Sequence, residues 1–199
     1  MALTAIPAQP ALRFEAALLA RASAIRAAIF DVDGVLTDGT LYISEAGETL
    51  KAFHALDGHG LKLLAMAGLT PIVITGRDSP AVRRRLKDLG IQHAVFGAHD
   101  KLAVAEPLLA QLGVRWEEVA VMGDDWPDLP LLVRAGLAVS PPNGHVEVRA
   151  LAHHVCATAG GHGAARECCD LLLLATGHYD RLLRSHAQTL DTTAEGPRT

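Results

Sequence analysis

The sequence predicts an α/β fold in which helices cover both faces of a doubly wound, parallel sheet. Two observations lead to this prediction: short apolar, β-rich runs alternate with segments of helical periodicity, and glycines close most of the helical segments. The length of 199 residues, 50% of them hydrophobic, suits one domain with a sizeable core. The predicted strands are "AAIF" (27–30), "PIVIT" (71–75), "HAVF" (93–96), "VAVMG" (119–123), "LAVS" (137–140) and an edge strand "HHVC" (153–156).

The intervening segments complete the expected order. Helices are predicted at 60–68, 79–90, 101–113 and 128–136, where apolar residues recur at helical spacing. Residues 1–24 are expected to be a leader helix before a domain at 25–179, and residues 180–199 a flexible C-terminus, because chain ends are commonly loose. The stretch "GTLYISEAGETLKAF" (39–53) breaks the alternation with a turn at "EAGE", which predicts an inserted β-hairpin.

Composition excludes several classes of function. The formal net charge of -4 leaves no basic surface field that would attract nucleic acid or an anionic membrane. Cys156, Cys168 and Cys169 are an odd number of thiols, two of them adjacent, which suits reduced cysteines better than a disulfide framework. Residues 1–24 lack the basic start of a secretory signal, and charged residues interrupt their apolar stretch, so we expect a cytoplasmic protein.

Acidic residues gather where predicted strands end. Asp31 and Asp33 follow "AAIF", and "GDDWPD" (123–128) stands at the end of another strand. In a doubly wound sheet, ligands bind at the carboxyl ends of the strands. Two carboxylates this close repel unless a cation neutralises them, and an all-oxygen site suits Mg²⁺. A carboxylate beside such an ion can attack phosphorus, and Thr75 and Lys101, each just after a strand, could neutralise the other oxygens of the transition state.

These residues carry a family resemblance. "DVDGVLTDG", "ITGR", Lys101 and "GDD" stand in the order of the four motifs of the haloacid dehalogenase superfamily, across roughly residues 27–140. More narrowly, about residues 25–178 resemble the 3-deoxy-D-manno-octulosonate (KDO) 8-phosphate phosphatase family, which makes a lipopolysaccharide sugar, through "DGVLTDG", "GETLKAFHALDGHGLKLL", "ITGRDS", "GDDWPDLPLL" and "AGGHGAARECCDLLL". The resemblance implies a Rossmann-type fold without a large cap domain. It also implies Mg²⁺-dependent hydrolysis of KDO 8-phosphate to KDO and phosphate through an aspartyl-phosphate.

The resemblance assigns catalytic and metal-binding roles by position. Asp31 would be the nucleophile and, together with Asp124, a ligand of Mg²⁺. Asp33 would be the general acid/base and would also bind the metal through its backbone carbonyl. Asp125 and Asp128 would be outer acids that hold Lys101 or waters on the metal.

Further residues would contact the substrate. Thr75 and the amide of Gly76 would hold phosphoryl oxygens, while Lys101 would balance the charge of the phosphate and of Asp31. Arg77 directly follows these two and could pair with an acidic group of the substrate, because a guanidinium matches carboxylate and phosphate.

The family also forms homotetramers, which the hairpin helps to build, and a neighbour's Gly-rich tail closes each active site. Here the tail is "AGGHGAARE" (159–167), in which Gly160, Gly161, Gly163 and Arg166 are the expected substrate contacts. Family members usually carry a basic residue where this chain has His162, so affinity for the substrate could depend on pH or on Arg166.

Alternatives exist for the function and for single residues. The substrate could be a related nonulosonate 9-phosphate, and a receiver-like signalling domain would also combine acids, a Thr and a Lys, although no acidic group would then follow the Lys. A catalytically silent oligomerising relative is a third alternative.

Asp38 and Asp57 alone could be turn formers or helix caps, and "RRR" (83–85) is typical of a solvated helix face. The His and Cys residues at 153–169 match no common zinc spacing.

Overall fold

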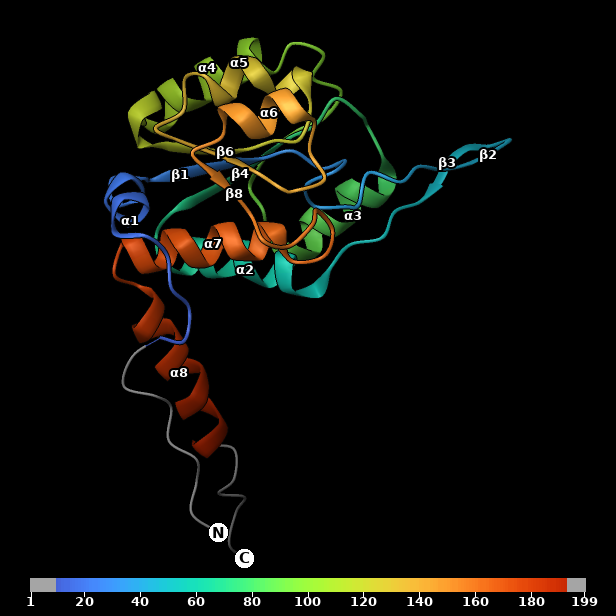
Figure 1. Ribbon diagram of the computed structural model, residues 1–199. Helices are drawn as coiled ribbons and strands as arrows, with labels where there is room; N and C mark the ends of the chain where they lie inside the picture. Colours follow the sequence, from blue (N-terminus) through green and yellow to red (C-terminus); the bar gives the residue numbers. More distant parts are fainter. Residues whose placement is uncertain (1–9, 193–199) are drawn as a thin grey trace, which may run out of the picture.

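The computed structural model describes residues 10–192, and its centre is a sheet of six parallel strands (Figure 1). The order across the sheet is β5-β4-β1-β6-β7-β8. Every residue of β1, β6 and β7 is buried, which explains why these strands read as uninterrupted apolar runs. The bounds are Ala27–Phe30 (β1), Thr70–Ile74 (β4), His93–Val95 (β5), Val119–Met122 (β6), Leu137–Ser140 (β7) and His154–Val155 (β8), so all six predicted strands are confirmed to within about one residue.

Alternate residues of each strand supply two separate apolar cores. Ala28 and Phe30 belong to one core, with the helices on that face of the sheet, whereas Ala27 and Ile29 belong to the other (Figure 1). The first face carries α1 (Ala16–Ala22), α2 (Ala55–Met66), α3 (Pro80–Leu89) and α7 (Ala164–Ala175). The second carries α4 (Lys101–Leu112), α5 (Leu129–Leu132) and α6 (Val146–Leu151), so the predicted doubly wound architecture is confirmed.

The strand order brings the chemical motifs together. β1 lies between β4 and β6, and its last residue, Phe30, is in register with Val73 and Met122. The residues that follow these three strands therefore meet at one edge of the sheet. That edge holds Asp31, Thr75 and Asp124.

The predicted insertion is an antiparallel hairpin made of β2 (Tyr42–Ser44) and β3 (Gly47–Leu50). It projects from the body of the protein in Figure 1. Three large apolar side chains on it are exposed to solvent: Tyr42 by 43%, Ile43 by 62% and Leu50 by 59%. The insertion is a two-stranded sheet and contains no helix, so it forms no large cap.

Some predicted helix bounds differ from the structure. Helix α2 begins at Ala55, before the predicted 60–68, and α5 ends at Leu132 instead of near 136. Gly136, which the helix does not reach, lies against the segment before β6, where a Cβ atom would be 2.1 Å from the backbone oxygen of Glu117. None of the helices in the described part combines the length and apolar character needed to cross a bilayer.

The chain ends also differ in part from the prediction. In the leader, α1 begins at Ala16, and residues 1–9 lie outside the described range. Most of the C-terminus expected to be flexible is helical, because Tyr179–Thr192 forms α8, in which Leu182 is only 4% exposed. Residues 193–199 lie outside the described range.

The Gly-rich segment 159–167 consists of a loop and the first turn of a core helix, α7. Cys168, Cys169 and Leu171–Leu173 of α7 are buried, and α7 packs against α2 and α1. Asp57 in the first turn of α2 caps α7: its carboxylate accepts hydrogen bonds from the amides of Gly163 (3.2 Å) and Arg166 (2.8 Å). Asp57 is therefore a structural cap, and truncation before residue 159 would delete part of the core.

Candidate active site

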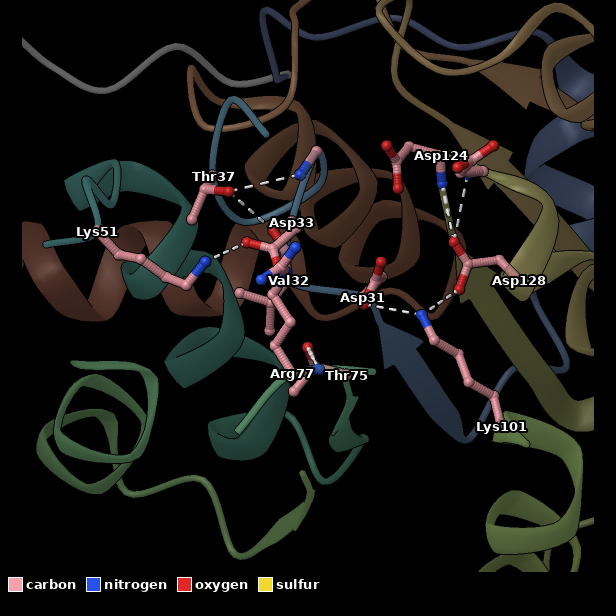
Figure 2. A network of polar contacts seen from close by, with 12 residues as sticks. Asp31, Val32, Asp33, Thr37, Lys51, Thr75, Arg77, Lys101, Asp124 and Asp128 are labelled. Carbon is pink, nitrogen blue, oxygen red and sulfur yellow. Dashed lines mark hydrogen bonds and ion pairs between the residues drawn. The ribbon is translucent and has the colours of Figure 1, made fainter. Parts of the chain in front are cut away.

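The loop after β1 places two carboxylates at the edge of the sheet. The amide of Asp31 continues the strand pairing by donating to the oxygen of Met122 (3.1 Å). The chain then turns, with the amides of Val35, Leu36 and Thr37 all donating to the oxygen of Val32. This tight turn fixes Asp31 and Asp33 close to the adjacent strand ends, as Figure 2 shows.

Lys101, the first residue of α4, connects two of the acidic residues. Its Nζ atom lies 2.8 Å from Oδ1 of Asp31 and 2.6 Å from Oδ1 of Asp128, and all three side chains are nearly buried (Figure 2). The second oxygen of Asp128 accepts from the amides of Asp124 (3.1 Å) and Asp125 (3.4 Å). Asp128 thus holds Lys101 and orders the acidic loop after β6, whereas the Asp125 side chain is exposed.

Asp31, Asp124 and Asp128 form a compact group of carboxylates, each offering an oxygen within 4.8 Å of the others. Gly34, with φ of +88°, leaves the space that Asp124 needs, because a Cβ atom there would lie 2.0 Å from Oδ2 of Asp124. One ammonium group cannot neutralise three carboxylates. The all-oxygen donor set and the excess of negative charge fit a small divalent cation such as Mg²⁺.

The pKa values of two of these acids reflect the crowding. Burial raises the pKa of Asp31 to about 7, and the charge of Asp128 adds to this increase, whereas Lys101 acts to lower the pKa. Burial also raises the pKa of Asp124 to about 7, and the charges of Asp31 and Asp128 add to this effect. For Lys101, burial acts to lower the pKa, but Asp31 and Asp128 raise it overall. The raised pKa values of the two acids reflect burial and crowded negative charge, which a bound cation would relieve.

The loop after β4 supplies a hydroxyl and a cation. Thr75 is buried, and its Oγ1 accepts a hydrogen bond from the amide of Arg77 (3.3 Å). The guanidinium of Arg77 is half exposed, and its Nε lies 3.6 Å from Oδ2 of Asp33. These groups face the same cavity as the carboxylates.

That cavity has a volume of about 360 Å³ and opens at the carboxyl edge of the sheet. Its lining joins residues from four separate parts of the sequence. They are Asp31, Asp33, Gly39, Thr75, Gly76, Arg77, Lys101, Asp124, Asp125, Pro127 and Asp128. The structure therefore gathers all of the catalytic, metal-binding and phosphate-binding residues expected from the four motifs.

The expected substrate contacts of the segment 159–167 do not line this cavity. A Cβ atom at Gly160 would lie 1.8 Å from the oxygen of Gly34, and one at Gly161 would lie 2.4 Å from the nitrogen of Asp38. These glycines thus allow close approach to the chain's own loop after β1. Arg166 is also directed elsewhere, because its Nε binds Asp170 (2.8 Å). Within this segment only His162 is exposed.

The sequence reasoning gave no role to two residues that contact the site. Lys51 is buried at the base of the hairpin and forms an ion pair with Asp33 (Figure 2). Asn143 donates to the oxygen of Gly34 (3.1 Å) and accepts from the amide of Gly160 (2.7 Å), so it ties the segment 159–167 to the loop after β1. The position of Lys51, between apolar residues of "TLKAF", is a signal that could have indicated burial.

Other polar residues that the sequence singled out have structural partners. Asp38 forms a turn by accepting from the amide of Thr40 (2.8 Å). His154, Cys156 and Glu167 lie close together, but Glu167 accepts from His154 and from the amides of Ala157 and Thr158, which orders the loop there. In the "RRR" run, Arg83 and Arg84 bind acids of their own surface, Asp78 and Asp88. None of these groups contributes to the cavity.

The fold and the site together define the class of the protein, a haloacid dehalogenase-like hydrolase. A family model for haloacid dehalogenase-like hydrolases matches residues 95–167. The chain is 42% identical, over 82% of its length and 87% of the relative's, to the 3-deoxy-D-manno-octulosonate 8-phosphate phosphatase of Escherichia coli.

Solved structures agree with this similarity. The phosphatase of the same name from Yersinia pestis superposes with a TM-score of 0.80 at 41% identity, covering 82% of this chain and 88% of that one. The enzyme from Moraxella catarrhalis, solved with a magnesium ion, a phosphate ion and KDO, gives 0.82 at 38% identity, covering 85% and 98%. The chain therefore belongs to the 3-deoxy-D-manno-octulosonate 8-phosphate phosphatase family.

Proposed function

We propose that this protein is a Mg²⁺-dependent phosphatase that hydrolyses KDO 8-phosphate to KDO and inorganic phosphate. The observation that carries the proposal is the carboxylate of Asp31 in the cavity, 2.8 Å from Lys101 and beside Asp124 and Thr75. The names of the relatives support the choice of substrate, and the M. catarrhalis relative holds magnesium, phosphate and the product sugar in its crystal structure.

Asp31, Asp124 and the backbone carbonyl of Asp33 would hold the metal ion. Bound there, Mg²⁺ would lower the negative charge of the phosphoryl group and of Asp31 as they approach each other. The carboxylates provide the oxygen donors that this ion prefers, and the ion would offset the burial and mutual repulsion that raise their pKa values.

In the first step, a carboxylate oxygen of Asp31 attacks phosphorus and forms the aspartyl-phosphate bond. The bond between phosphorus and the sugar oxygen breaks, and the carboxyl proton of Asp33 goes to that leaving oxygen. Lys101, the Thr75 hydroxyl and the Gly76 amide stabilise the charge on the three other phosphoryl oxygens. The sugar leaves with a hydroxyl group at the position that carried the phosphate.

In the second step, a water molecule attacks the phosphorus of the aspartyl-phosphate. Asp33, now a carboxylate, takes a proton from this water, and the bond between phosphorus and Asp31 breaks. Inorganic phosphate leaves, and both aspartates return to their starting protonation states. Asp33 can serve both steps because it stands two residues from the nucleophile at the same cavity.

Assembly of several copies is part of the proposal. The exposed Tyr42, Ile43 and Leu50 on the hairpin form an apolar surface of the kind that copies of a chain bury against one another. We expect a homotetramer in which a neighbour's segment 159–167 faces the cavity. Because Gly160, Gly161 and Arg166 are bound within their own chain, the exposed His162 is the residue of that segment best placed to reach a neighbour.

The cytoplasm is the expected location. The three cysteines, Cys156, Cys168 and Cys169, are free and buried. Buried free thiols suit a reducing compartment.

A panel of sugar phosphates tests the proposed substrate. Phosphate release with Mg²⁺ would be compared by kcat/KM for KDO 8-phosphate, nonulosonate 9-phosphates, neutral hexose phosphates and 4-nitrophenyl phosphate. We expect the highest value for KDO 8-phosphate. A higher kcat/KM for a nonulosonate 9-phosphate would mean that this compound, and not KDO 8-phosphate, is the preferred substrate. Equal kcat/KM values for all compounds would contradict a specific sugar phosphatase.

A further inference from the structure

Lys51 reaches the catalytic loop from the base of the inserted hairpin. It directly follows β3, and its side chain is only 1% exposed. Its ammonium forms an ion pair with Oδ1 of Asp33 and lies 3.2 Å from Oε2 of Glu48 (Figure 2). It approaches Asp33 from the side opposite to Asp31 and Lys101, as Figure 2 shows.

Burial makes the orientation of this ammonium well defined. A buried charge is costly unless charged partners and hydrogen bonds compensate for it, so Lys51 has little freedom to leave Asp33 and Glu48. Asp33 is consequently held through one of its two oxygens. The other oxygen, Oδ2, is the one near Arg77 in the cavity.

We propose that Lys51 is a positioning residue that fixes the carboxyl group of Asp33 for its two proton transfers. Lys51 is not among the residues that line the cavity, so it acts through Asp33 and not on the substrate. With Oδ1 bound to Lys51, Oδ2 remains for the leaving oxygen of the sugar and then for the attacking water. The inserted hairpin would therefore orient the general acid/base in addition to any part in assembly.

This inference rests on the proposed function, because it assumes that Asp33 transfers protons during phosphate ester hydrolysis. General acid/base catalysis contributes about 10²–10⁴-fold to a rate. A residue that only orients the acid is expected to supply part of that factor. Without Lys51, we expect kcat for the sugar phosphate to fall about tenfold or more, with KM little changed.

The test compares Lys51→Met with Lys51→Arg and with a matched control, Lys87→Met, whose side chain is exposed on α3. Lys51→Arg should restore most of kcat because it keeps the cation. The double variant Glu48→Gln with Lys51→Met loses the two hairpin charges together, so it stays informative if Lys51→Met alone folds poorly. Circular dichroism and size-exclusion chromatography check the fold and the assembly of each protein.

Two readouts separate positioning from a general structural role. The first is a double-mutant cycle with Asp33→Asn, in which Lys51→Met should cause no further loss because the group it orients is already disabled. The second is the rate of aspartyl-phosphate formation. It should fall for the sugar phosphate but hardly for 4-nitrophenyl phosphate, whose leaving group needs no proton.

The outcomes distinguish this inference from the proposed function. If the wild-type protein releases no phosphate from any ester, the proposed function fails. If the wild type is active and Asp33→Asn is impaired, two results would overturn the role of Lys51. One is additive losses in the double-mutant cycle. The other is an equal loss in the rate of aspartyl-phosphate formation for the sugar phosphate and for 4-nitrophenyl phosphate. An unchanged kcat in folded Lys51→Met, or in the folded double variant with Glu48→Gln, would overturn it as well.

Discussion

The Nζ atom of Lys101 lies 2.8 Å from Oδ1 of Asp31, and the two side chains are only 3% and 12% exposed. A buried ammonium this close keeps one oxygen of the carboxylate in a fixed direction. Asp128 holds the same ammonium from the other side. The proposed nucleophile, Asp31, is therefore oriented by residues that lie far from it in the sequence.

Replacing Asp128 tests that arrangement. Asp128→Asn should lower the free energy of unfolding by about 1–3 kcal/mol, because Lys101 loses one of two buried partners and keeps Asp31. The rate of phosphate release should fall at the same time. Urea denaturation measures the first effect, and the control Asp88→Asn, which breaks a surface pair with Arg84, should change stability by less than about 0.5 kcal/mol. Equal effects of the two substitutions would contradict a structural role of Asp128.

The raised pKa values of Asp31 and Asp124 predict how pH changes stability. Both rise from 3.8 to about 7 on folding, so between these values the folded protein binds more protons than the unfolded chain. Stability without metal should therefore fall as pH rises from about 4 to about 7, and the penalty should stay fully present above that. Mg²⁺ favours the charged carboxylates. It should raise the melting temperature more at pH 8 than at pH 5, and an equal or larger shift at pH 5 would contradict this account.

Asp124 should control the affinity for the metal. Asp124→Ala is expected to raise the Mg²⁺ concentration for half-maximal activity about tenfold or more and to lower the rate. Ca²⁺ should substitute poorly, since its longer bonds and higher coordination number would shift the attacking carboxylate. The exposed Asp78 offers a control, Asp78→Ala, which should leave the Mg²⁺ requirement unchanged. Full activity of the wild type in EDTA would refute the metal requirement.

Gly160 should not tolerate a side chain. A Cβ atom there would lie 1.8 Å from the oxygen of Gly34, so Gly160→Ala must displace either the segment 159–167 or the loop after β1. We expect lower thermal stability and a reduced rate, because that loop carries Asp31 and Asp33. Ala157→Ser serves as the control, because Ala157 is an exposed residue just before the segment 159–167. Retention of wild-type melting temperature and activity by Gly160→Ala would show that the contact is unimportant.

The sequence allowed the main site to be predicted because three of the four motifs directly follow a strand, and Lys101 begins the helix after another. Once the strands are parallel and adjacent, Asp31, Thr75 and Asp124 must meet at one edge of the sheet. Lys51 and Asn143 escaped prediction because they come from an insertion and from the loop between β7 and α6, whose paths depend on tertiary packing. No local pattern indicates which carboxylate a lysine at such a position will meet.

The Gly-rich segment shows a different limit of sequence reasoning. Glycines at 160 and 161 indicated a close backbone approach, and within the chain they lie against the loop at Gly34 and Asp38. The C-terminal helix α8 was missed because chain ends are loose by default, whereas here the buried Leu182 anchors it.

Trapping the phosphorylated enzyme tests the central claim most directly. Wild-type protein would be mixed with KDO 8-phosphate labelled on phosphorus, quenched in acid within a single turnover, digested and analysed for the labelled residue. We expect the label on Asp31, and we expect Asp31→Asn to form no labelled enzyme and to turn over at less than about a hundredth of the wild-type rate, because an amide is a far poorer nucleophile than a carboxylate. Turnover without any labelled peptide, a label on another residue, or substantial activity of folded Asp31→Asn would contradict the account.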